Sequence, residues 1–401
     1  MKLEKMPFGT ADILLPNTEF EKWACVACDQ FTSEPQYWLD AEKNVGDAPS
    51  AFNLIIPEVW LGQNDAERVE KINAEMHRYL DEKIFTEYPD SMIYVERTLP
   101  NGSVRRGLVG AVDLEAYDYA PDSKSPVRAT EGTVISRIPP RVAVREGAPI
   151  EMPHIMLLVD DIERSVIEPL KNADLPKLYD FELMLGGGHI CGYLLSRKEN
   201  PELVDGVEKA LSEIAGKTAD DGVLIAMGDG NHSLATAKEC YRRNPTDRNR
   251  YALAELVNIH DEALVFEPIY RVVFGCDPAE LLCECKKALT PGKNKIEWHT
   301  ATEKGEISTD ELVTDVLQRV IDDYVASHPD AECDYVHGVE STLTLAKEKD
   351  DRIAFIFDGM DKSELFPYVE NKGALPRKTF SMGEAESKRY YIEARRIDPK
   401  E

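Results

Sequence analysis

The sequence predicts an α+β fold, and two observations lead to that class. Strand-like segments occur in pairs around turn residues, which indicates antiparallel hairpins. Amphipathic helices lie between these pairs, but helices and strands do not alternate one by one as in a parallel α/β chain. Hydrophobic residues make up 43% of the 401 residues, which is typical of a chain with a large folded core.

Two hairpins are indicated by apolar runs on either side of turn residues. Met92–Arg97 and Arg105–Val112 flank Pro-Asn-Gly at 100–102. Two further apolar runs flank three glycines at 186–188, which form either a tight turn or a nest of N–H groups beside a ligand. Near the C-terminal end, Ser341–Ala346 and Arg352–Phe357 are predicted to form a third antiparallel strand pair.

Apolar residues at three- and four-residue spacing predict the helices. In the first of them the apolar positions are Val69, Ile72, Met76 and Leu80. The last is expected to be capped by Ser308 or Thr309. The predicted helices span Asp65–Glu82, Val204–Ala215, a segment after Ser233, Pro278–Ala288 and Thr309–Ala326, and isolated strands are expected at Val223–Met227 and Leu264–Phe274.

Three regions are predicted along the chain. A polar, proline-bearing stretch at Asp118–Pro126 is typical of a connector, and a new unit begins near residue 262. The regions are therefore an N-terminal α+β region (1–126), a central core (127–261) and a C-terminal α+β region (262–401). A length of roughly 100 to 200 residues per domain agrees with two or three such units.

Charge and composition restrict the partners. Lys and Arg number 47 against 74 Asp and Glu, a net charge of −27. Such a surface repels nucleic-acid phosphates and anionic membranes, so we expect neither partner. No apolar run has membrane-spanning length and the first residues lack a signal-peptide core, so a cytoplasmic protein is expected.

The eight cysteines are expected to be buried and reduced, and metal binding by Cys25-x-x-Cys28 is the weaker alternative.

The segment Gly228-Asp229-Gly230-Asn231-His232-Ser233 carries the strongest local signal for function. It follows a short apolar strand and opens a helix, whose first N–H groups and dipole favour a phosphate. The spacing matches neither a Walker loop nor a dinucleotide fingerprint. A purely structural alternative has Asp229 or Asn231 as helix cap. Basic residues are dense nearby, at Arg128, Arg137, Arg141, Arg145 and, further on, Arg164.

The same segment resembles the Asp-Gly-His-His-Arg motif of a large uncharacterised protein family, and other landmarks of that family follow in order. They resemble its Tyr-Asp, Arg-Pro-His-Glu-x-Thr, Pro-x-His-Arg and Pro-x-Lys-Ser-Thr segments and extend from about residue 25 to 380. In this chain they are Cys28-Asp29, Val127–Thr133, Phe266–Arg271 and Leu375–Thr379.

The resemblance implies a ParB/sulfiredoxin-like core with additional mixed α/β elements, related to the free-serine kinases. By position, it implies that Glu131 is the catalytic base and that residues 228–232 cradle phosphate. Asn231 replaces the first motif histidine and Ser233 replaces the motif arginine. Three alternatives follow: another cation holds the phosphate, the donor differs, or the activity has been lost. The candidates for the other cation are Arg128, Arg137, Arg141, Arg377 and Lys378.

We therefore expect a small-molecule kinase that transfers phosphate to a hydroxyl acceptor such as free serine. The catalytic residues are predicted to be Glu131, Asp229 and His232, with Asp229 binding Mg²⁺. The donor is ATP, ADP or pyrophosphate. The alternatives are a nucleotide-binding switch without transfer and a hydrolase of a phosphorylated metabolite. Residues predicted to contact the donor are Gly228, Gly230, Asn231, Ser233, Arg128, Arg137 and Lys378.

Overall fold

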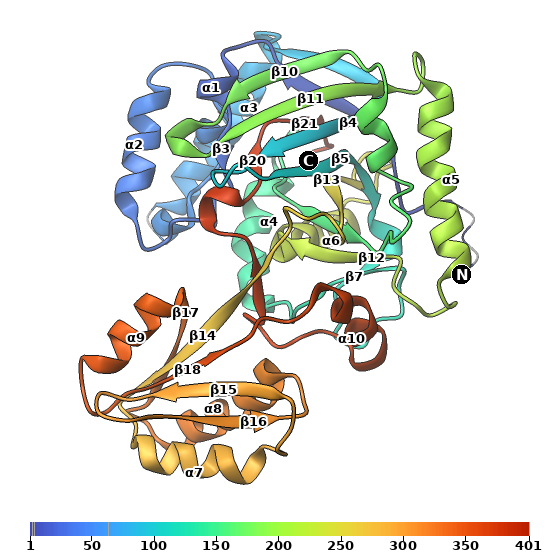
Figure 1. The fold of residues 1–401 in the computed structure, drawn as a ribbon. Helices are drawn as coiled ribbons and strands as arrows, with labels where there is room; N and C mark the ends of the chain where they lie inside the picture. Colours follow the sequence, from blue (N-terminus) through green and yellow to red (C-terminus); the bar gives the residue numbers. More distant parts are fainter. Residues whose placement is uncertain (2, 4, 63, 401) are drawn as a thin grey trace. The chain divides into compact units, whose positions relative to one another are not determined.

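The computed structural model describes residues 1, 3, 5–62 and 64–400 and confirms an α+β fold (Figure 1). Its contacts divide the chain into two compact units. The first contains residues 1–264 and 384–401, and the second contains residues 265–383. The three-region division at 126 and 261 stays a prediction.

The first unit is built on one large mixed sheet. From one edge, its order is β6-β7-β12-β9-β13-β5-β4-β2-β21-β8. In addition, β1 pairs with β5, β11 pairs with β4, and β10 pairs with β11. A separate short pair joins β3 to β20. The strands are β1 (Phe8–Gly9), β2 (Ala11–Pro16), β3 (Cys25–Val26), β4 (Phe85–Thr98), β5 (Val104–Asp113), β6 (Tyr117–Asp118), β7 (Val127–Arg128), β8 (Ile150–Glu151), β9 (Met156–Val159), β10 (Lys177–Glu182), β11 (His189–Ser196), β12 (Ile225–Asp229), β13 (Tyr251–Asn258), β20 (Tyr390–Tyr391) and β21 (Ala394–Arg396).

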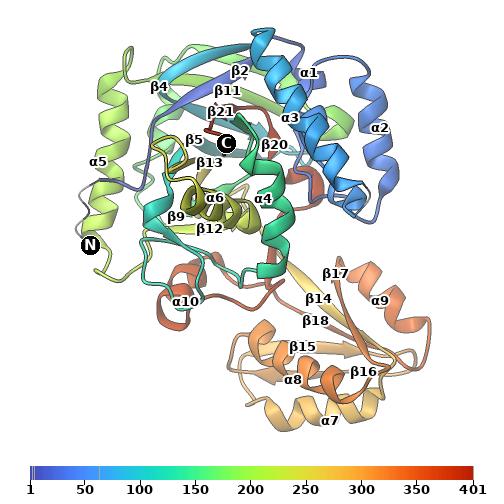
Figure 2. The same cartoon turned by 180° about the vertical axis from the view of Figure 1, so that it is seen from behind.

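Both faces of this sheet are covered, because successive residues of a strand point to opposite faces. In β4, Ile93 and Val95 join one apolar cluster, whereas Met92 and Tyr94 join another. α1, α2 and α3 contribute to the first cluster, and α5 and α6 to the second. Figure 2 shows α4 and α6 side by side. The helices are α1 (Phe20–Trp23), α2 (Pro35–Val45), α3 (Asp65–Asp81), α4 (Ile138–Glu146), α5 (Pro201–Lys217) and α6 (Asn231–Arg243).

The second unit has its own sheet, in the order β16-β15-β18-β14-β17, with β19 paired to β14. α7 and α8 pack on one face, where Leu281 and Leu317 meet Phe355. α9 packs on the other through Ala346. Its elements are β14 (Phe266–Phe274), α7 (Pro278–Ala288), β15 (Asn294–His299), β16 (Lys304–Thr309), α8 (Val313–Ser327), β17 (Glu332–His337), α9 (Val339–Lys347), β18 (Ile353–Phe357), α10 (Leu365–Lys372) and β19 (Phe380–Met382).

Most predicted elements are confirmed, with small shifts at their ends. The hairpins around residues 100–102 and 186–188 are the pairs β4–β5 and β10–β11. The helices predicted from residues 65, 204 and 278 are α3, α5 and α7. The strands predicted at residues 223 and 264 are β12 and β14.

The strand predicted at Ser341–Ala346 was wrong, because this segment lies within the helix α9. Thr342 and Ala346, four residues apart, are buried on one face of it. The Thr342 hydroxyl donates to the carbonyl of Gly338 at 2.8 Å, which satisfies its polar group inside the helix. The predicted partner strand does form, as β18, but it pairs with β14 and β15 instead.

The start of the following predicted helix was also misplaced. Residues up to Thr309 belong to strand β16, and α8 begins only at Val313. Thr309 does not cap the helix, because its Oγ1 accepts from the N–H of Glu311 at 3.1 Å and makes a turn.

The eight cysteines are all free thiols. Cys25, Cys240, Cys276 and Cys285 are buried as expected. The expectation of burial was wrong for Cys283, which is exposed on α7, and three others are half-buried: Cys28, Cys191 and Cys333.

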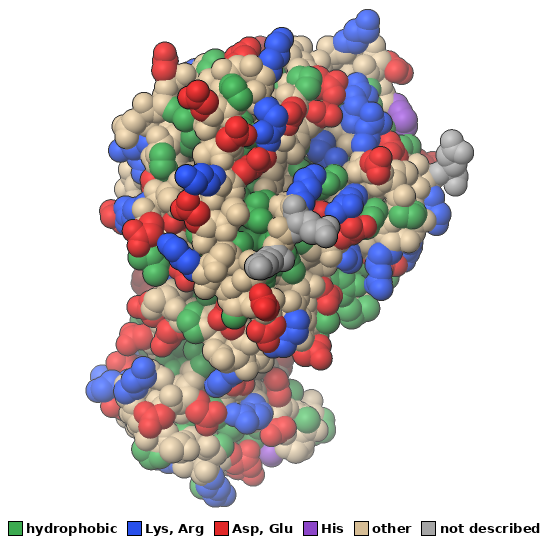
Figure 3. Space-filling view, turned by 90° about the vertical axis from the view of Figure 1, so that its right-hand side faces the viewer, with side chains coloured by type: hydrophobic (Ala, Val, Ile, Leu, Met, Phe, Trp, Pro, Cys, Tyr) green, Lys and Arg blue, Asp and Glu red, His purple; other side chains and the backbone are tan. Residues whose placement is uncertain are grey.

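None of the helices in the described part of the chain is long and apolar enough to cross a membrane. On the face shown in Figure 3, acidic and basic side chains are interspersed over the surface.

Candidate functional site

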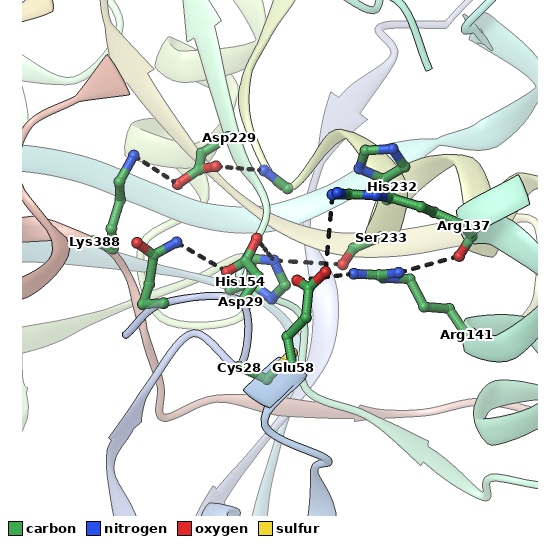
Figure 4. Close-up of polar contacts among 12 residues, drawn as sticks. Cys28, Asp29, Glu58, Arg137, Arg141, His154, Asp229, His232, Ser233 and Lys388 are labelled. Atoms are coloured by element: carbon green, nitrogen blue, oxygen red, sulfur yellow. Dashed lines mark hydrogen bonds and ion pairs between the residues drawn. The ribbon is translucent and has the colours of Figure 1, made fainter. Parts of the chain in front are cut away.

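Two antiparallel strand pairs bring four polar residues to one place in the first unit. β12 runs antiparallel to β9, so Asp229, at the end of β12, lies near His154, which precedes β9. β3 runs antiparallel to β20, so Asp29, which follows β3, lies near Lys388, which precedes β20. Figure 4 shows these four side chains together beside the start of α6.

A glycine is needed where the chain turns from β12 into α6. Gly230 has φ +80°, in the left-handed region that favours glycine. A Cβ here would lie 3.0 Å from the Cα of Ile155. The N–H of Gly230 donates to Oδ1 of Asp229 at 2.9 Å, which fixes that carboxylate at the start of the helix.

Lys388 and Asp229 form a largely buried ion pair. The Nζ of Lys388 lies 3.4 Å from Oδ2 of Asp229, and the two side chains are 8% and 20% exposed. Each charge is therefore compensated by its partner more than by water.

Asp29 forms the second acidic position. One oxygen accepts from Gln30 at 2.9 Å, and the other lies 3.7 Å from Nε2 of His154. Burial opposes ionisation of this carboxyl, but the charge of His154, the Gln30 hydrogen bond and the cations Lys388 and Arg141 hold its pKa below the usual value. Asp29 is therefore an anion near neutral pH.

His154 joins Asp29 to Ser233 and Tyr391. Its Nδ1 lies 2.7 Å from the Tyr391 hydroxyl, and its Nε2 lies 3.5 Å from Oγ of Ser233. The ring is almost completely buried, so these contacts fix its orientation. Ser233, which occupies the position of the motif arginine, thus contacts a buried histidine.

His232 lies on the other side of the helix start. Its Nε2 accepts a hydrogen bond from the N–H of Val134 at 3.3 Å, so the neutral ring carries its proton on Nδ1. Burial, followed by the charges of Arg141 and Arg137, lowers the pKa of His232 to about 4. His232 is therefore neutral near pH 7, and only Nδ1 can donate to a ligand.

Two arginines of the α4 region act electrostatically on His232 and pair with Glu58. Arg141 lies on α4 and Arg137 immediately before it. Their guanidinium groups lie 3.4 Å and 3.8 Å from the carboxylate of Glu58, between the helix start and Cys28 (Figure 4). Glu58 is held here because its N–H donates to the carbonyl of Cys28 at 2.7 Å.

Asn231 ties the loop that carries Glu131 to the start of α6. Its Nδ2 donates to the backbone carbonyl of Glu131 and to Oγ1 of Thr133, both at 3.1 Å. The structure therefore places the half-buried Glu131 in a loop attached to the Gly228–Ser233 turn.

Arg128 and Lys378 were also predicted to contact the donor. Arg128 is buried on β7 and donates to the carbonyls of Ser125 and Gly222, which precede β7 and β12, so its guanidinium points away from the end of β12 that carries Asp229. Lys378 belongs to the second unit, where its carbonyl accepts from Arg271 at 2.9 Å.

A cavity of about 170 Å³ adjoins the cluster. Its walls are mostly apolar, and its polar lining residues are Glu58, Arg141, Arg145, Glu151, His154, Ser233, Thr236 and Tyr391. Cys28 also lines it, and burial raises the pKa of this thiol to about 12, so it stays protonated. The apolar wall residues are Leu54, Ile55, Ile56, Leu61, Met76, Val144, Ala148, Ile150, Met152 and Ile155.

Sequence reasoning found Asp229, Gly230 and His232 but missed His154, Lys388 and Glu58. A signal was present for Lys388, since Lys388-Arg389-Tyr390-Tyr391 combines two cations with two aromatic residues. Nothing local indicates His154, because its environment depends on strand pairing and on Tyr391, 237 residues away.

Comparison with known proteins identifies the family. A family model described as "Protein of unknown function (DUF1015)" matches residues 9–394, so the chain belongs to that family, and the expectation from the sequence motifs is confirmed. No curated protein matches the chain.

Three solved structures are similar over most of their length. A mutant free serine kinase in complex with AMP shares 11% identity, covers 71% of this chain and 91% of its own, and has a TM-score of 0.42. A conserved hypothetical protein from Pyrococcus furiosus shares 11% identity, with coverages of 73% and 96% and a TM-score of 0.37. SbnI with a C-terminal truncation, from Staphylococcus aureus, shares 10% identity, with coverages of 73% and 85% and a TM-score of 0.36.

Proposed function

We propose that this member of the DUF1015 family is a small-molecule kinase. It transfers a phosphoryl group from ATP, ADP or pyrophosphate to the hydroxyl group of a small acceptor, with free serine as the first acceptor to test. One observation carries the proposal: cations and carboxylates gather beside the start of α6, where Lys388 pairs with Asp229 and both Arg137 and Arg141 pair with Glu58. The charges of Lys388 and Arg141 also act on Asp29.

The start of α6 is the proposed phosphate site. The first N–H groups of a helix have no acceptor within the helix, and their partial positive charge favours a phosphate. Arg137 and Arg141 add full charges and planar donor groups that suit phosphate oxygens. The neutral His232 adds one donor at Nδ1. In this proposal the arginines of the α4 region replace the arginine that Ser233 has displaced from the motif.

The adjoining cavity suits the organic part of a ligand. Small-molecule sites combine apolar walls with a few polar groups that set orientation. Here the polar groups include Ser233, His154 and Arg141, and aliphatic side chains supply most of the walls. The cavity opens beside the helix start, so a ligand can place its phosphate there and its apolar part against the walls.

The carboxylate oxygens of Asp229 and Asp29 are ligands of the kind that Mg²⁺ binds. This ion binds oxygen ligands and usually keeps several waters while contacting one or two carboxylates and the substrate phosphates. Asp229 and Asp29 would hold it, and its charge would neutralise the transferring phosphate. Lys388 already contacts Asp229, so this lysine would share the phosphate charge.

Glu131 is the proposed base. Its carboxylate accepts the acceptor's hydroxyl proton while the acceptor oxygen forms a bond to phosphorus and the bond to the leaving phosphate or nucleoside phosphate breaks. General-base help of this kind contributes about 10²- to 10⁴-fold to the rate. Asn231 holds the Glu131 backbone at the helix start, so the base is attached to the same turn as the phosphate site.

Phosphorus NMR tests the proposal. The purified protein with Mg²⁺ is given ATP, ADP or pyrophosphate, each with and without serine and other hydroxyl compounds. A phosphomonoester signal that needs the acceptor is expected, and Glu131→Gln should bind the donor normally but lose at least about 100-fold in rate. Phosphate release without an acceptor would show that the protein is a hydrolase and not a kinase. Donor binding without turnover would replace it by a binding switch, and unchanged donor spectra would overturn phosphate binding itself.

A further inference from the structure

Three side chains with three kinds of ligand atom face one another on the β10–β11 hairpin. They are Asp180, His189 and Cys191, which offer a carboxylate oxygen, an imidazole nitrogen and a thiol sulfur. One ligand atom from each lies within 4.8 Å of the others. Among the residues that the structure describes, this is the only group of three His, Cys, Asp or Glu side chains with such spacing.

The strand register explains why the three share a face. Asp180 pairs directly with Cys191 across the two strands. His189 lies two residues before Cys191, and side chains two residues apart point to the same face of a strand. The grouping is thus a property of the sheet and does not depend on a flexible loop.

The contacts hold the ligand atoms in place while leaving them accessible. Nε2 of His189 lies 2.8 Å from Oδ1 of Asp180, and Sγ of Cys191 lies 3.9 Å from Nδ1 of His189. The other oxygen of Asp180 is paired with Lys177, which orients the carboxylate. The side chains of Asp180 and His189 are 41% and 30% exposed, so an ion can reach them from solvent.

We propose that Asp180, His189 and Cys191 form a Zn²⁺ site. Zinc binds this mixture of oxygen, nitrogen and sulfur ligands with bonds of about 2.0 to 2.3 Å, which places neighbouring ligand atoms roughly 3 to 4 Å apart. The three ligand atoms lie within 4.8 Å of one another, so side-chain shifts of up to about 1 Å bring them into that range. The Cys191 thiol gives up its proton to solvent when the metal binds.

Water takes the fourth position. Glu96 on β4 pairs with Cys191 from the other side, but its carboxylate accepts from the Tyr94 hydroxyl at 3.0 Å and lies 3.4 Å from Nε of Arg106. Three protein ligands and one water make an open zinc site. Because the site bridges β10 and β11, the metal ties the two strands of the hairpin together. This proposal is independent of the proposed kinase.

Cobalt substitution tests the site, because Co²⁺ bound to a thiolate gives a near-ultraviolet charge-transfer band. Tag-free full-length protein is freed of metal with a chelator and titrated with Co²⁺ alone and then with Zn²⁺. The wild-type chain should show the band at one equivalent and lose it when Zn²⁺ displaces the cobalt. Cys191→Ser should lack the band, and the matched control Cys283→Ser, at the exposed cysteine of α7, should retain it.

Two further measurements separate a metal site from a merely structural cluster. His189→Ala should weaken Zn²⁺ binding by about tenfold or more while its circular dichroism stays that of the wild type. Zn²⁺ should raise the Tm of the wild type and of Cys283→Ser but not of Cys191→Ser, since a ligand stabilises the state that binds it. A missing band in the wild type, a band that survives in Cys191→Ser, or one lost in Cys283→Ser would each overturn the proposal.

Discussion

At the scale of single residues, the ion pair of Lys388 with Asp229 links the C-terminal segment to the start of α6. Lys388→Met removes the cation and leaves a largely buried carboxylate without compensation. The free energy of unfolding should fall by about 2 kcal/mol, as is typical when one partner of a buried hydrogen-bonded charge is lost. Denaturant unfolding measures this loss.

A double variant distinguishes the loss of the Lys388–Asp229 ion pair from a general loss of stability. Asp229→Asn keeps an oxygen that can accept from the Gly230 N–H but has no charge to compensate. The double variant Lys388→Met with Asp229→Asn should therefore be less destabilised than the sum of the single variants, with a coupling of about 0.5 to 3 kcal/mol. Simple additivity would show that the two side chains do not interact in solution.

His232 gives a pH prediction with a definite sign. Its pKa falls from the usual 6.5 to about 4 on folding, so the unfolded chain takes up the proton first. The stability from the neutral ring is complete above pH 6.5 and is lost as the pH falls from 6.5 toward about 4. The free energy of unfolding should therefore fall more steeply in this window for the wild type than for His232→Gln.

The glutamine amide can still accept from the Val134 N–H, so this comparison isolates protonation. His77→Gln, at an exposed position of α3, controls for the loss of an imidazole ring. Parallel pH profiles for the wild type and His232→Gln would show that the environment does not disfavour the charged ring.

Whether a residue of the site could be predicted from the sequence depends on how far along the chain its partners lie. Asp229 and Gly230 could be predicted because a strand, a glycine turn and a helix start occur together within a few residues. The run of cations and aromatic residues that begins at Lys388 marks it as a candidate, but its partner could not be predicted, and neither could that of His154. These partners lie 159 and 237 positions away along the chain (388 − 229 and 391 − 154). A single sequence gives no information on pairing at such distances.

At the scale of elements, the turn between β12 and α6 depends on Gly230. Gly230→Ala would put a Cβ at a φ of +80° and 3.0 Å from the backbone of Ile155. The free energy of unfolding should fall by about 1 to 3 kcal/mol, and donor binding should weaken because the N–H groups of the helix start shift. Thermal unfolding and donor titration measure the two effects.

Gly206→Ala is the matched control. Gly206 lies in the exposed part of α5, and an added Cβ meets nothing within 4 Å. Alanine is a better helix former than glycine, so this variant should gain about 0.5 to 1 kcal/mol and bind the donor unchanged. Equal losses in both variants would contradict a special role for the turn.

Elements were predicted well where apolar periodicity extends over many residues, and poorly where it is short. α3 has four apolar positions over several turns, and its bounds match the prediction to one residue at its end. The segment that forms α9 is short, and its threonines and leucines alternate as in a strand. Its packing on β14 and β18 and the Thr342 hydrogen bond decide in favour of helix.

At the scale of the whole molecule, the second unit is an insertion in the first. The chain leaves the first unit after Leu264 and re-enters it at Glu384. The ends of the second unit lie together, because Phe266 pairs with Met382 and the Gly383 N–H donates to the Val265 carbonyl at 3.2 Å. Composition and local pattern suggested a new unit near residue 262, but not that the last residues return to the first.

The returning segment supplies buried charges that the first unit needs. Arg389 donates to Glu255 at 2.9 Å and to Glu393 at 2.6 Å, and all three side chains are at most 5% exposed. Arg395 donates to the buried Glu151 at 2.7 Å. Without this segment, Glu255 would lose its arginine partner in the interior, which costs several kcal/mol of stability.

Residues 1–264 alone should therefore fail to unfold cooperatively in urea. The same residues joined to 384–401 by a short Gly/Ser linker should recover a cooperative transition, because the linker spans ends that the β14–β19 pairing already holds close. Residues 265–383, which have their own apolar core, should unfold cooperatively as a separate fragment. An equally cooperative transition for 1–264 with and without the returning segment would show that the buried arginines do not stabilise the first unit. In that case Lys388 too would be dispensable for its fold, and its pairing with Asp229 would matter only for the ligand.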